Sequence, residues 1–493
     1  MGNVSQITAS RSEQALWTAS MQYNELGQEI ERILPGDVIS KWQYDVAGRP
    51  THHRISSQNG DTRRRAYNWD VNQRLRSIVN ELTGVKVTYG YDEFSNLVWS
   101  NQGGQFDFLH RSFDDVGNLY ETKEKKDRVY GAGSRLLETK EATFSYDDEG
   151  NLIQKFEKNG DTWKYEYYGN GMMSKVIKPD NTEVTFKYDP LGRRIEKCSD
   201  EKTTSFVWDG NTILHECFTQ NDSEKFENLV ESSLQTDSEI VDNLVTWVFN
   251  DGFVPSAKIT NEGNYSIISD YLGTPVEAYD EEGNKVWSAE LDIYGRVNEF
   301  TGEKNFIPFR YQGQYEDVET GLYFNRFRYY SPSEGMYTQP DPIGLSGGIK
   351  LYSYVHDPNI WIDPFGLAKR GPKTDGKGPH NEMIKAWGDE VEANGGTVLN
   401  GGGRRQETLI ETPGGNKQGR RPDIIYRDAD GNKKWGNVGK TKKDGSPIKR
   451  EQQALDDLNN VRGKHNVADP VEFRSYNHPE HNNKSSGTLC KKK

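Results

Sequence analysis

At 493 residues, the chain is longer than one hydrophobic core usually serves, which indicates at least two domains. Only 33% of its residues are hydrophobic, yet 26 Tyr and 11 Trp exclude a disordered chain and favour an extended β architecture. The net charge of −13 divides into −21 over residues 1–367 and +8 over residues 368–493, so the basic C-terminal part is expected to meet a polyanion such as nucleic acid.

Several classes of protein are excluded by what the sequence lacks. Three scattered cysteines are too few for a disulfide framework or a zinc knuckle. No apolar run reaches the length of a membrane span, and residues 1–11 do not form a secretory signal peptide. We therefore expect a protein made in the cytoplasm that leaves the cell, if it does, without a signal peptide.

A short N-terminal segment, residues 1–22, precedes a repeat. The repeat is an aromatic residue followed by Asp or Asn and then closely by Gly. Most neighbouring copies are 20 to 25 residues apart, at Tyr23-Asn24, Tyr44-Asp45, Trp69-Asp70, Tyr91-Asp92, Phe113-Asp114, Tyr146-Asp147, Tyr167-Tyr168, Tyr188-Asp189 and Trp208-Asp209. Asp and Gly provide the side-chain bond and the positive φ of a tight turn, so each copy predicts a strand, a turn and a returning strand. One unit cannot bury its apolar face alone, and the units must stack.

These repeats resemble the YD repeats of Rhs proteins and of the C components of insecticidal toxin complexes. The resemblance implies that residues 23–269 form a hollow β-shell, or cocoon, in a multidomain and mostly β protein. An ordinary β-solenoid or propeller is the alternative.

From residue 270 the pattern changes and becomes more specific. The segment 270–367 contains Tyr294-Gly295-Arg296, a run from Glu319 to Tyr330, Asp341-Pro342 and the closing Asp363-Pro364-Phe365-Gly366-Leu367. It resembles the Rhs-associated core with its terminal D-P-x-G-L motif. That resemblance implies that the chain cuts itself between Leu367 and Ala368 and frees an enclosed C-terminal cargo.

Self-cleavage of this kind needs two carboxyl groups that share one site. Two like charges held close together raise one pKa, so that one group stays protonated while the other activates water. Asp341 and Asp363 are the matching positions, and either Arg326 or Arg328 is expected to orient them. Ser331 departs from the family, which often has Asp there. The alternative is that the two Asp-Pro pairs only begin turns.

A Gly-, Pro- and Lys-rich linker, residues 368–378, leads into a small domain over residues 379–493. Its apolar pattern predicts the order helix, three strands, helix, strand. The expected helices cover 380–394 and about 447–461, the second with Ser446 as its N-cap. The expected strands are 406–411, 422–427, 434–441 and 470–476.

This order of elements resembles the PD-(D/E)xK nucleases, whose fold is that of the restriction endonucleases. The resemblance implies that Asp423 holds Mg²⁺ and that Lys440 positions the attacking water. The usual second acid is missing, since Val438 stands two residues before Lys440. Glu451 lies on the apolar stripe of the second helix and is the proposed replacement as catalytic and metal-binding acid. Gln452 is its expected support, and Glu407 and Glu411 are weaker candidates.

Basic residues near these positions are expected to contact the phosphates of a nucleic acid. They are Arg404, Arg405, Arg420 and Arg421. Rival activities have less support: a deaminase would need an H-x-E motif with P-C-x-x-C, and only Cys490 is present in this region. His478 and His481 suggest a histidine-based metal nuclease, but no second ligand cluster accompanies them.

The combined prediction is an antibacterial Rhs effector whose shell encloses and releases a Mg²⁺-dependent nuclease acting on DNA or RNA, with DNA preferred. A non-nuclease toxin, or a tail that binds nucleic acid or acts in adhesion without catalysis, is the alternative. The resemblance implies a cognate immunity protein and type VI-like delivery with a secretion-system spike and a chaperone or adaptor. The toxin would act in the cytoplasm of the target cell. Because repeats begin at about Tyr23, the chain is expected to be a C-terminal portion of such an effector.

Overall fold

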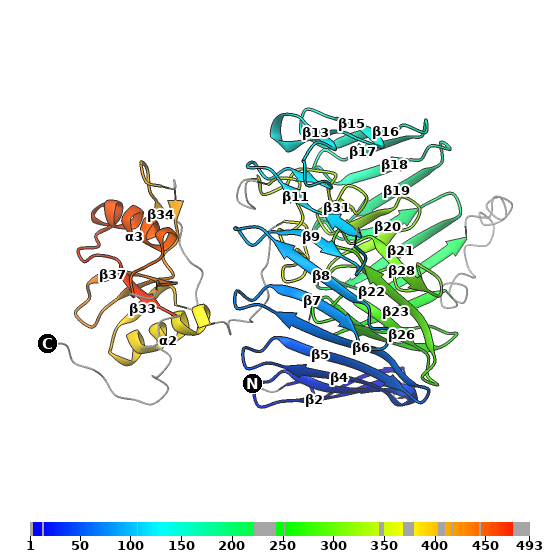
Figure 1. Ribbon diagram of the computed structural model, residues 1–493, viewed down its shortest axis with the longest axis horizontal. Coiled ribbons are helices and arrows are strands. Elements are labelled where there is room, and N and C mark those ends of the chain that lie inside the picture. Colours follow the sequence, from blue (N-terminus) through cyan, green and yellow to red (C-terminus); the bar gives the residue numbers. More distant parts are fainter. Residues whose placement is uncertain are drawn as a thin grey trace. The chain divides into compact units, whose positions relative to one another are not determined.

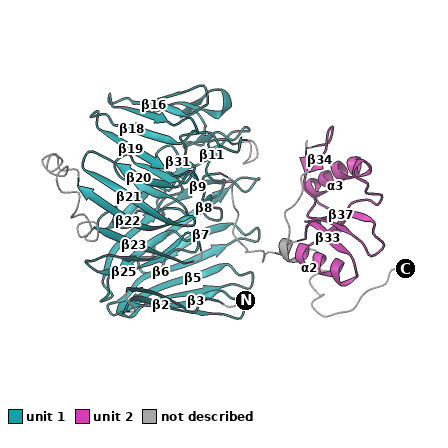
Figure 2. Cartoon of the chain, turned by 180° about the vertical axis from the view of Figure 1, so that it is seen from behind, with its two compact units in different colours: residues 1–372 teal, residues 373–493 magenta. Residues whose placement is uncertain are grey.

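The chain forms two compact units, Met1–Pro372 and Lys373–Lys493 (Figure 2). The computed structural model describes residues 3–11, 14–105, 107–220, 243–250, 252–344, 350–367, 379–402, 410–416, 419–442 and 445–476. The boundary between the two units lies close to residue 367, after which the net charge of the chain changes from negative to positive. No helix in the described part of the chain is long and apolar enough to cross a membrane.

Unit 1 consists of long antiparallel sheets in which consecutive strands are neighbours, as Figure 1 shows. The first sheet contains β1 (Gln6–Arg11), β2 (Gln14–Tyr23), β3 (Glu29–Leu34), β4 (Val38–Tyr44), β5 (Pro50–Ser57), β6 (Gly60–Trp69), β7 (Leu75–Asn80), β8 (Lys86–Tyr91), β9 (Leu97–Asn101) and β10 (Phe108–His110). A short pair follows, formed by β11 (Ser112–Phe113) and β12 (Leu119–Tyr120).

The second sheet is longer and continues the same meander. Its strands are β13 (Arg128–Tyr130), β14 (Leu136–Thr139), β15 (Ala142–Tyr146), β16 (Leu152–Glu157), β17 (Thr162–Tyr167), β18 (Met173–Ile177), β19 (Glu183–Tyr188), β20 (Arg194–Cys198), β21 (Lys202–Asp209), β22 (Thr212–Gln220), β23 (Leu244–Asn250), β24 (Val254–Ile259), β25 (Asn264–Ser269), β26 (Pro275–Tyr279), β27 (Lys285–Leu291) and β28 (Val297–Thr301). The mostly β class predicted for this part of the chain is confirmed.

The repeated Asp forms the turn that joins two strands. In the turn after β4, Asp45 Oδ1 accepts the backbone amides of Ala47 and Arg49 at 2.9 and 3.0 Å. Gly48 has a φ of 80°, a conformation that glycine adopts without steric cost. The same pair of amide bonds recurs at Asp70, Asp92, Asp114, Asp189, Asp270 and Asp292. The predicted strand–turn–strand unit is therefore confirmed.

The aromatic residue before the Asp connects one hairpin to the preceding one. The hydroxyls of Tyr91, Tyr167 and Tyr188 donate to the carbonyls of Leu75, Leu152 and Met173, each at 2.8 Å. A buried tyrosine hydroxyl needs such a partner. Stacking and register of the repeats therefore depend on the same residue type.

A four-stranded sheet from the last part of unit 1 packs against the larger sheets. Its strands are β29 (Tyr315–Asp317), β30 (Leu322–Asn325), β31 (Arg328–Ser331) and β32 (Met336–Tyr337). Phe324 and Tyr329 share a buried cluster with Phe186 and Phe206 of the long sheet. The salt bridge between Arg194 and Asp317, with Nη1 and Oδ2 2.5 Å apart, also ties β20 to β29, and both residues are buried.

Unit 2 is a small α/β fold. Its sheet has the order β33 (Thr397–Gly401), β36 (Ile424–Arg427), β37 (Lys433–Gly439) and β38 (Glu472–Ser475). The first three strands are antiparallel, and β38 is parallel to β37. The helical elements are α2 (Pro379–Ala393), α3 (Lys449–Val461) and the 3-10 turn η4 (Arg462–His465).

Three features of this unit differ from expectation. The first strand of the sheet is β33, which was not among the expected strands and which glycines flank on both sides. Of the expected strand 406–411, residues 410–411 form β34 (Ile410–Glu411), which pairs with β35 (Gly419–Arg420) in a separate ribbon, and 406–409 lie outside the described residues. Ser446 is not the N-cap of α3; that position is Ile448, and Pro447 forms an isolated bridge with Thr441.

Candidate functional sites

The two aspartates predicted to share a site both contact Arg328 of β31. The Arg328 Nη2 atom is 3.3 Å from Asp341 Oδ2 and 3.5 Å from Asp363 Oδ2. The side chains of Asp341, Asp363 and Arg328 are 6%, 1% and 1% exposed, so the two carboxyl groups and the guanidinium form one buried group. A single cation between two carboxyl groups cannot fully neutralise both, which favours retention of one proton.

Arg326 has different partners, so Arg328 is the one of the two candidate arginines that contacts the aspartates. It occupies the turn between β30 and β31 with a φ of 56°. Its Nη2 donates to the Leu191 carbonyl at 3.2 Å, and its guanidinium carbon lies 5.3 Å from the ring centroid of Trp208. Of the two arginines, only Arg328 contacts the aspartates through an interaction that the structure records.

The last residues of unit 1 are held at the same place. Asp363 Oδ1 accepts the Leu367 amide at 2.9 Å, and Arg328 Nε donates to the Gly366 carbonyl. Gly366 has a φ of 64°, and a Cβ there would lie 2.6 Å from the Asn325 carbonyl oxygen, so only glycine fits. The carboxyl group is thus fixed beside the residue that precedes the predicted cut. Ala368, on the other side of that bond, lies outside the described residues.

Burial raises the pKa of Asp363, and the neighbouring charge of Asp341 adds to the rise. The Arg328 charge, the Leu367 amide and the Tyr337 hydroxyl act in the opposite direction on this pKa. Tyr337 donates to Asp363 Oδ2 at 3.0 Å and accepts from Asn325 Nδ2 at 2.8 Å. Sequence reasoning missed these two residues because nothing in their local pattern distinguishes them from other core residues.

A third Asp-Pro pair lies close by in sequence and provides a comparison. Asp357 is fully buried, and its Oδ1 accepts the Asn359 amide at 3.0 Å. Burial raises its pKa to about 7, against weaker opposing effects of the Asn359 amide, Arg111, Tyr91 and Arg74. Unlike Asp341 and Asp363, it has no ion pair with Arg328 among the contacts of the described residues.

We expect Asp357→Asn to stabilise unit 1 at pH 8 and to change little at pH 4. The folded state binds this proton more tightly than the unfolded state does, so stability is lost as pH rises from about 4 to about 7. A shift of about three pKa units corresponds to an upper bound of about 4 kcal/mol. Denaturant unfolding of wild type and variant at both pH values measures the difference, and an equal effect at pH 4 and pH 8 would contradict the assignment.

In unit 2, Asp423 directly precedes β36 and reaches across to β37. Its Oδ2 accepts the Val438 amide at 2.6 Å. Glu451, in the first turn of α3, is 8% exposed and packs on the next residue of β37. A Cβ on Gly439 would lie 2.8 Å from the Glu451 carboxyl carbon, so glycine makes room for the carboxylate. The two acids therefore approach consecutive residues of one strand.

Two further residues of this region belong to the same strand end. Lys440 directly follows β37 and is exposed. Asn437 shares the face of Trp435 and Gly439, because side chains alternate along a strand. Its Oδ1 is buried and has no hydrogen-bond partner among the described residues. Asn437 belongs to no motif that predicts a role for it, although an amide oxygen is a suitable ligand for a hard cation.

The remaining predicted residues of unit 2 lie apart from this group or outside the described part. Gln452 is exposed and donates to Asp456 Oδ1 at 2.9 Å, so it does not support Glu451 as expected. Arg420 is largely buried in an ion pair with Asp457, 2.6 Å apart, which opposes the expected phosphate contact. Arg421 is exposed, as is Glu411 on the ribbon. Outside the described residues lie Arg404, Arg405, Glu407, His478, His481 and Cys490.

The donor set at the end of β37 fits a hydrated Mg²⁺ better than a metal enclosed by protein. Among the described residues, no group of three or more His, Cys, Asp or Glu is placed to hold a metal ion. Asp423 and Glu451 supply carboxylates, and Asn437 has an unsatisfied buried oxygen. Mg²⁺ in phosphoryl-transfer sites commonly keeps several waters and takes only one or two protein carboxylates.

Known proteins resemble this chain over about three quarters of its length. A double-stranded DNA deaminase toxin A from Burkholderia cenocepacia is 29% identical over 376 residues, which are 71% of this chain and 26% of that protein. A probable deoxyribonuclease RhsA from Dickeya dadantii is 26% identical over 406 residues, 77% of this chain and 26% of that protein. The chain thus spans about a quarter of the length of these relatives.

A solved structure shows a looser likeness. The crystal structure of a TcdB2–TccC3–TEV complex covers 71% of this chain and 21% of its own, with 17% identity and a TM-score of 0.37. The profile of the Teneurin YD-shell family matches residues 13–210 and 238–351, which include most strands of both long sheets. The repeated Asp turns lie within the same ranges. The chain therefore belongs to the Teneurin YD-shell family.

Proposed function

We propose that the chain belongs to an Rhs-type effector, in which the YD-shell cuts the chain after Leu367 and the released unit 2 cleaves nucleic acid. The observation that carries the first step is the buried group of Asp341, Asp363 and Arg328, with Asp363 bound to the Leu367 amide. The shell is proposed to enclose the toxic unit until that cut has been made.

The chemistry proposed for the cut is hydrolysis by a carboxyl pair. Asp341 acts as the base that takes a proton from water as the water oxygen adds to the Leu367 carbonyl carbon. Asp363, whose pKa is raised, acts as the acid and gives its proton to the Ala368 nitrogen as the C–N bond breaks. The products are a Leu367 carboxylate and an Ala368 ammonium group. Arg328 holds the two carboxyl groups in one place through its Nη2 atom.

The second step is supported by the group at the end of β37. Asp423 and Glu451 would hold Mg²⁺, with Asn437 as a further oxygen donor, and the ion would offset charge on the scissile phosphate. Lys440, which is exposed and directly follows β37, would orient a water and counter developing negative charge. The Dickeya relative is named a probable deoxyribonuclease, which agrees with this chemistry, and DNA is the preferred substrate in the proposal with RNA as the second.

Metal dependence tests the nuclease directly. Purified full chain is incubated with supercoiled plasmid and, separately, with tRNA, with Mg²⁺ or with EDTA. We expect cleavage only with Mg²⁺, and recovery when Mg²⁺ exceeds EDTA. Cleavage that persists in EDTA would contradict the magnesium site. Retarded migration of intact nucleic acid, without cleavage in any condition, would favour the alternative of a binding tail without catalysis.

The proposal of an Rhs-type effector also includes how the protein is delivered and how the producing cell is protected. An effector of this type needs an immunity protein that protects the producing cell, a secretion-system spike and a chaperone or adaptor for delivery without a signal peptide. The toxic unit would act in the cytoplasm of the target cell. Growth arrest on expression of residues 368–493 inside bacteria, relieved by a co-expressed immunity protein, is the expected result.

A further inference from the structure

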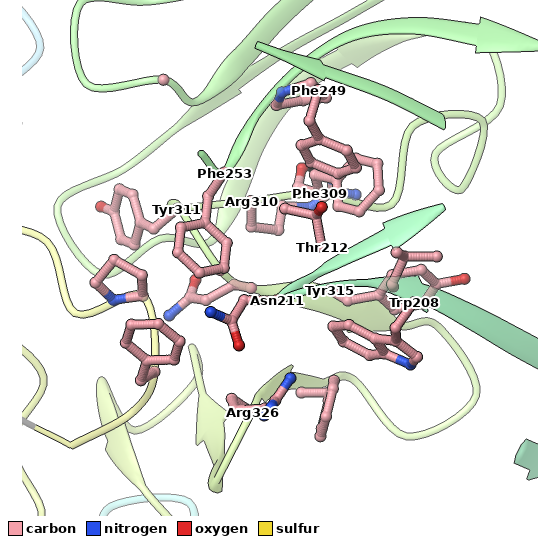
Figure 3. A pocket seen from close by; sticks show the side chains of 18 residues that line it. Trp208, Asn211, Thr212, Phe249, Phe253, Phe309, Arg310, Tyr311, Tyr315 and Arg326 are labelled. Carbon is pink, nitrogen blue, oxygen red and sulfur yellow. Dashed lines mark hydrogen bonds between the residues drawn. The ribbon is translucent and has the colours of Figure 1, made fainter. Parts of the chain in front are cut away.

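A small cavity in unit 1, separate from the Asp341–Asp363 pair, is lined by a buried cation, Arg326, for which the described residues show no ion pair. The cavity has a volume of about 30 Å³. Eight of the 18 residues that line it are aromatic, and Figure 3 shows Phe253 and Trp208 on opposite sides, with Arg326 below them and Asn211 above Arg326. No Asp or Glu is among the residues that line it.

Arg326 is the unusual member of this lining. Its residue is 7% exposed, and its Nε and Nη1 atoms are buried without a hydrogen-bond partner among the described residues. Only Nη2 has a recorded partner, the Leu191 carbonyl. Burial lowers the pKa of Arg326, and the charge of Asp189 acts in the opposite direction. A buried cation with unsatisfied N–H groups is strongly unfavourable unless an anion meets it.

Arg310, the second cation in the lining, has an ion pair and hydrogen bonds. Arg326 is therefore the lining cation with unsatisfied N–H groups among the described residues. Arg310 forms an ion pair with Glu316 and donates to the carbonyls of Ile307 and Phe309 at 2.8 and 2.7 Å. The other unsatisfied group is the amide of Gln314, which is 1% exposed and whose Oε1 and Nε2 both lack partners among the described residues. Gln314 therefore offers a further donor in the lining of the same cavity.

We propose that this cavity binds a small organic monocarboxylate that carries an aromatic or apolar body. A guanidinium presents its N–H groups in a planar fork that matches a carboxylate, and the Gln314 amide can donate a further hydrogen bond. The volume of about 30 Å³ holds only the carboxylate head of such a ligand. The body would lie outside that volume, against the half-buried rings of Phe249, Phe253 and Phe365.

The site adjoins the chain that leads to the predicted cut. Pro364 and Phe365 line the cavity, and Phe365 packs edge-on against Phe253 with centroids 5.3 Å apart. Arg326 and Arg328, two residues apart, thus serve different sites: Arg328 contacts the aspartates, and Arg326 faces the cavity. Binding of a carboxylate to this cavity can be measured whether or not the chain is cut after Leu367. The proposed binding site and the proposed self-cleavage can therefore fail separately.

The experiment compares benzoate with benzamide, which has the same shape but no charge. Isothermal titration of the full chain at pH 7 is expected to give binding of benzoate at least ten-fold tighter than of benzamide. Arg326→Gln should remove that preference. Arg49→Gln, which alters an arginine of a repeat turn far along the sequence, is the matched control and should leave it unchanged. Thermal unfolding checks that both variants are folded.

Two results would overturn the proposal. One is equal affinity for benzoate and benzamide in the wild-type chain, which needs no variant and so does not depend on folding of a mutant. The other is absence of binding of either compound at millimolar concentration, which would mean that ordered water alone satisfies Arg326 and Gln314. Arg326→Lys keeps the charge but loses the planar fork, and we expect it to retain only part of the preference.

Discussion

Asp363→Asn is expected to leave the purified protein as one chain of 56.2 kDa on a denaturing gel, whereas the wild type separates into residues 1–367 and 368–493. The amide cannot give a proton to the leaving nitrogen, and loss of a general acid slows a reaction by about 10² to 10⁴. Its Oδ1 can still accept the Leu367 amide, so the local fold should survive. Mass spectrometry of the wild-type fragments should place the new ends at Leu367 and Ala368.

The matched control is Asp357→Asn, which changes a buried Asp of a neighbouring Asp-Pro pair by the same chemistry. It should cleave like the wild type, because Asp357 accepts the Asn359 amide and lies outside the group around Arg328. A wild-type chain that remains whole would count against the proposed cut. Equal loss of cleavage in both variants would mean that cleavage requires any buried Asp of this region and not specifically the pair of Asp341 and Asp363.

Asp423→Asn and Glu451→Gln should each reduce nucleic-acid cleavage by about 10²-fold or more. Each change removes one of the two carboxylates proposed to hold the metal, and metal ions supply several kcal/mol of transition-state stabilisation. Asp423→Asn keeps an oxygen for the Val438 amide, so unit 2 should remain folded. Initial rates of plasmid nicking at saturating Mg²⁺, together with circular dichroism of each variant, measure the effect.

Glu411→Gln is the control for this pair. Glu411 was the weaker candidate for the missing acid, and it is exposed on the ribbon of β34 and β35. It should retain wild-type activity. If Glu411→Gln inactivates the enzyme while Glu451→Gln does not, the second acid has been assigned to the wrong residue. Full activity of Asp423→Asn would contradict the magnesium site as a whole.

The repeats of unit 1 could be predicted well because their structure is local. An Asp that accepts amides two and four residues ahead, followed by a residue with positive φ, needs nothing from elsewhere in the chain, as Asp45 and Gly48 show. In unit 2 the same kind of reasoning missed β33, since glycines on both sides concealed a strand that packing supports. Local signals fail where burial, rather than turn chemistry, decides the conformation.

The sequence by itself determined the family, the repeat unit and the candidate residues Asp341, Asp363 and Asp423. Only the tertiary structure decided which arginine meets the aspartates, because Arg326 and Arg328 are equivalent in charge and differ only in where a turn directs them. It also brought Glu451 over Gly439, from elements that are separate along the chain. Side chains distant in sequence meet through packing of whole elements, and that packing depends on many weak contacts that no short motif records.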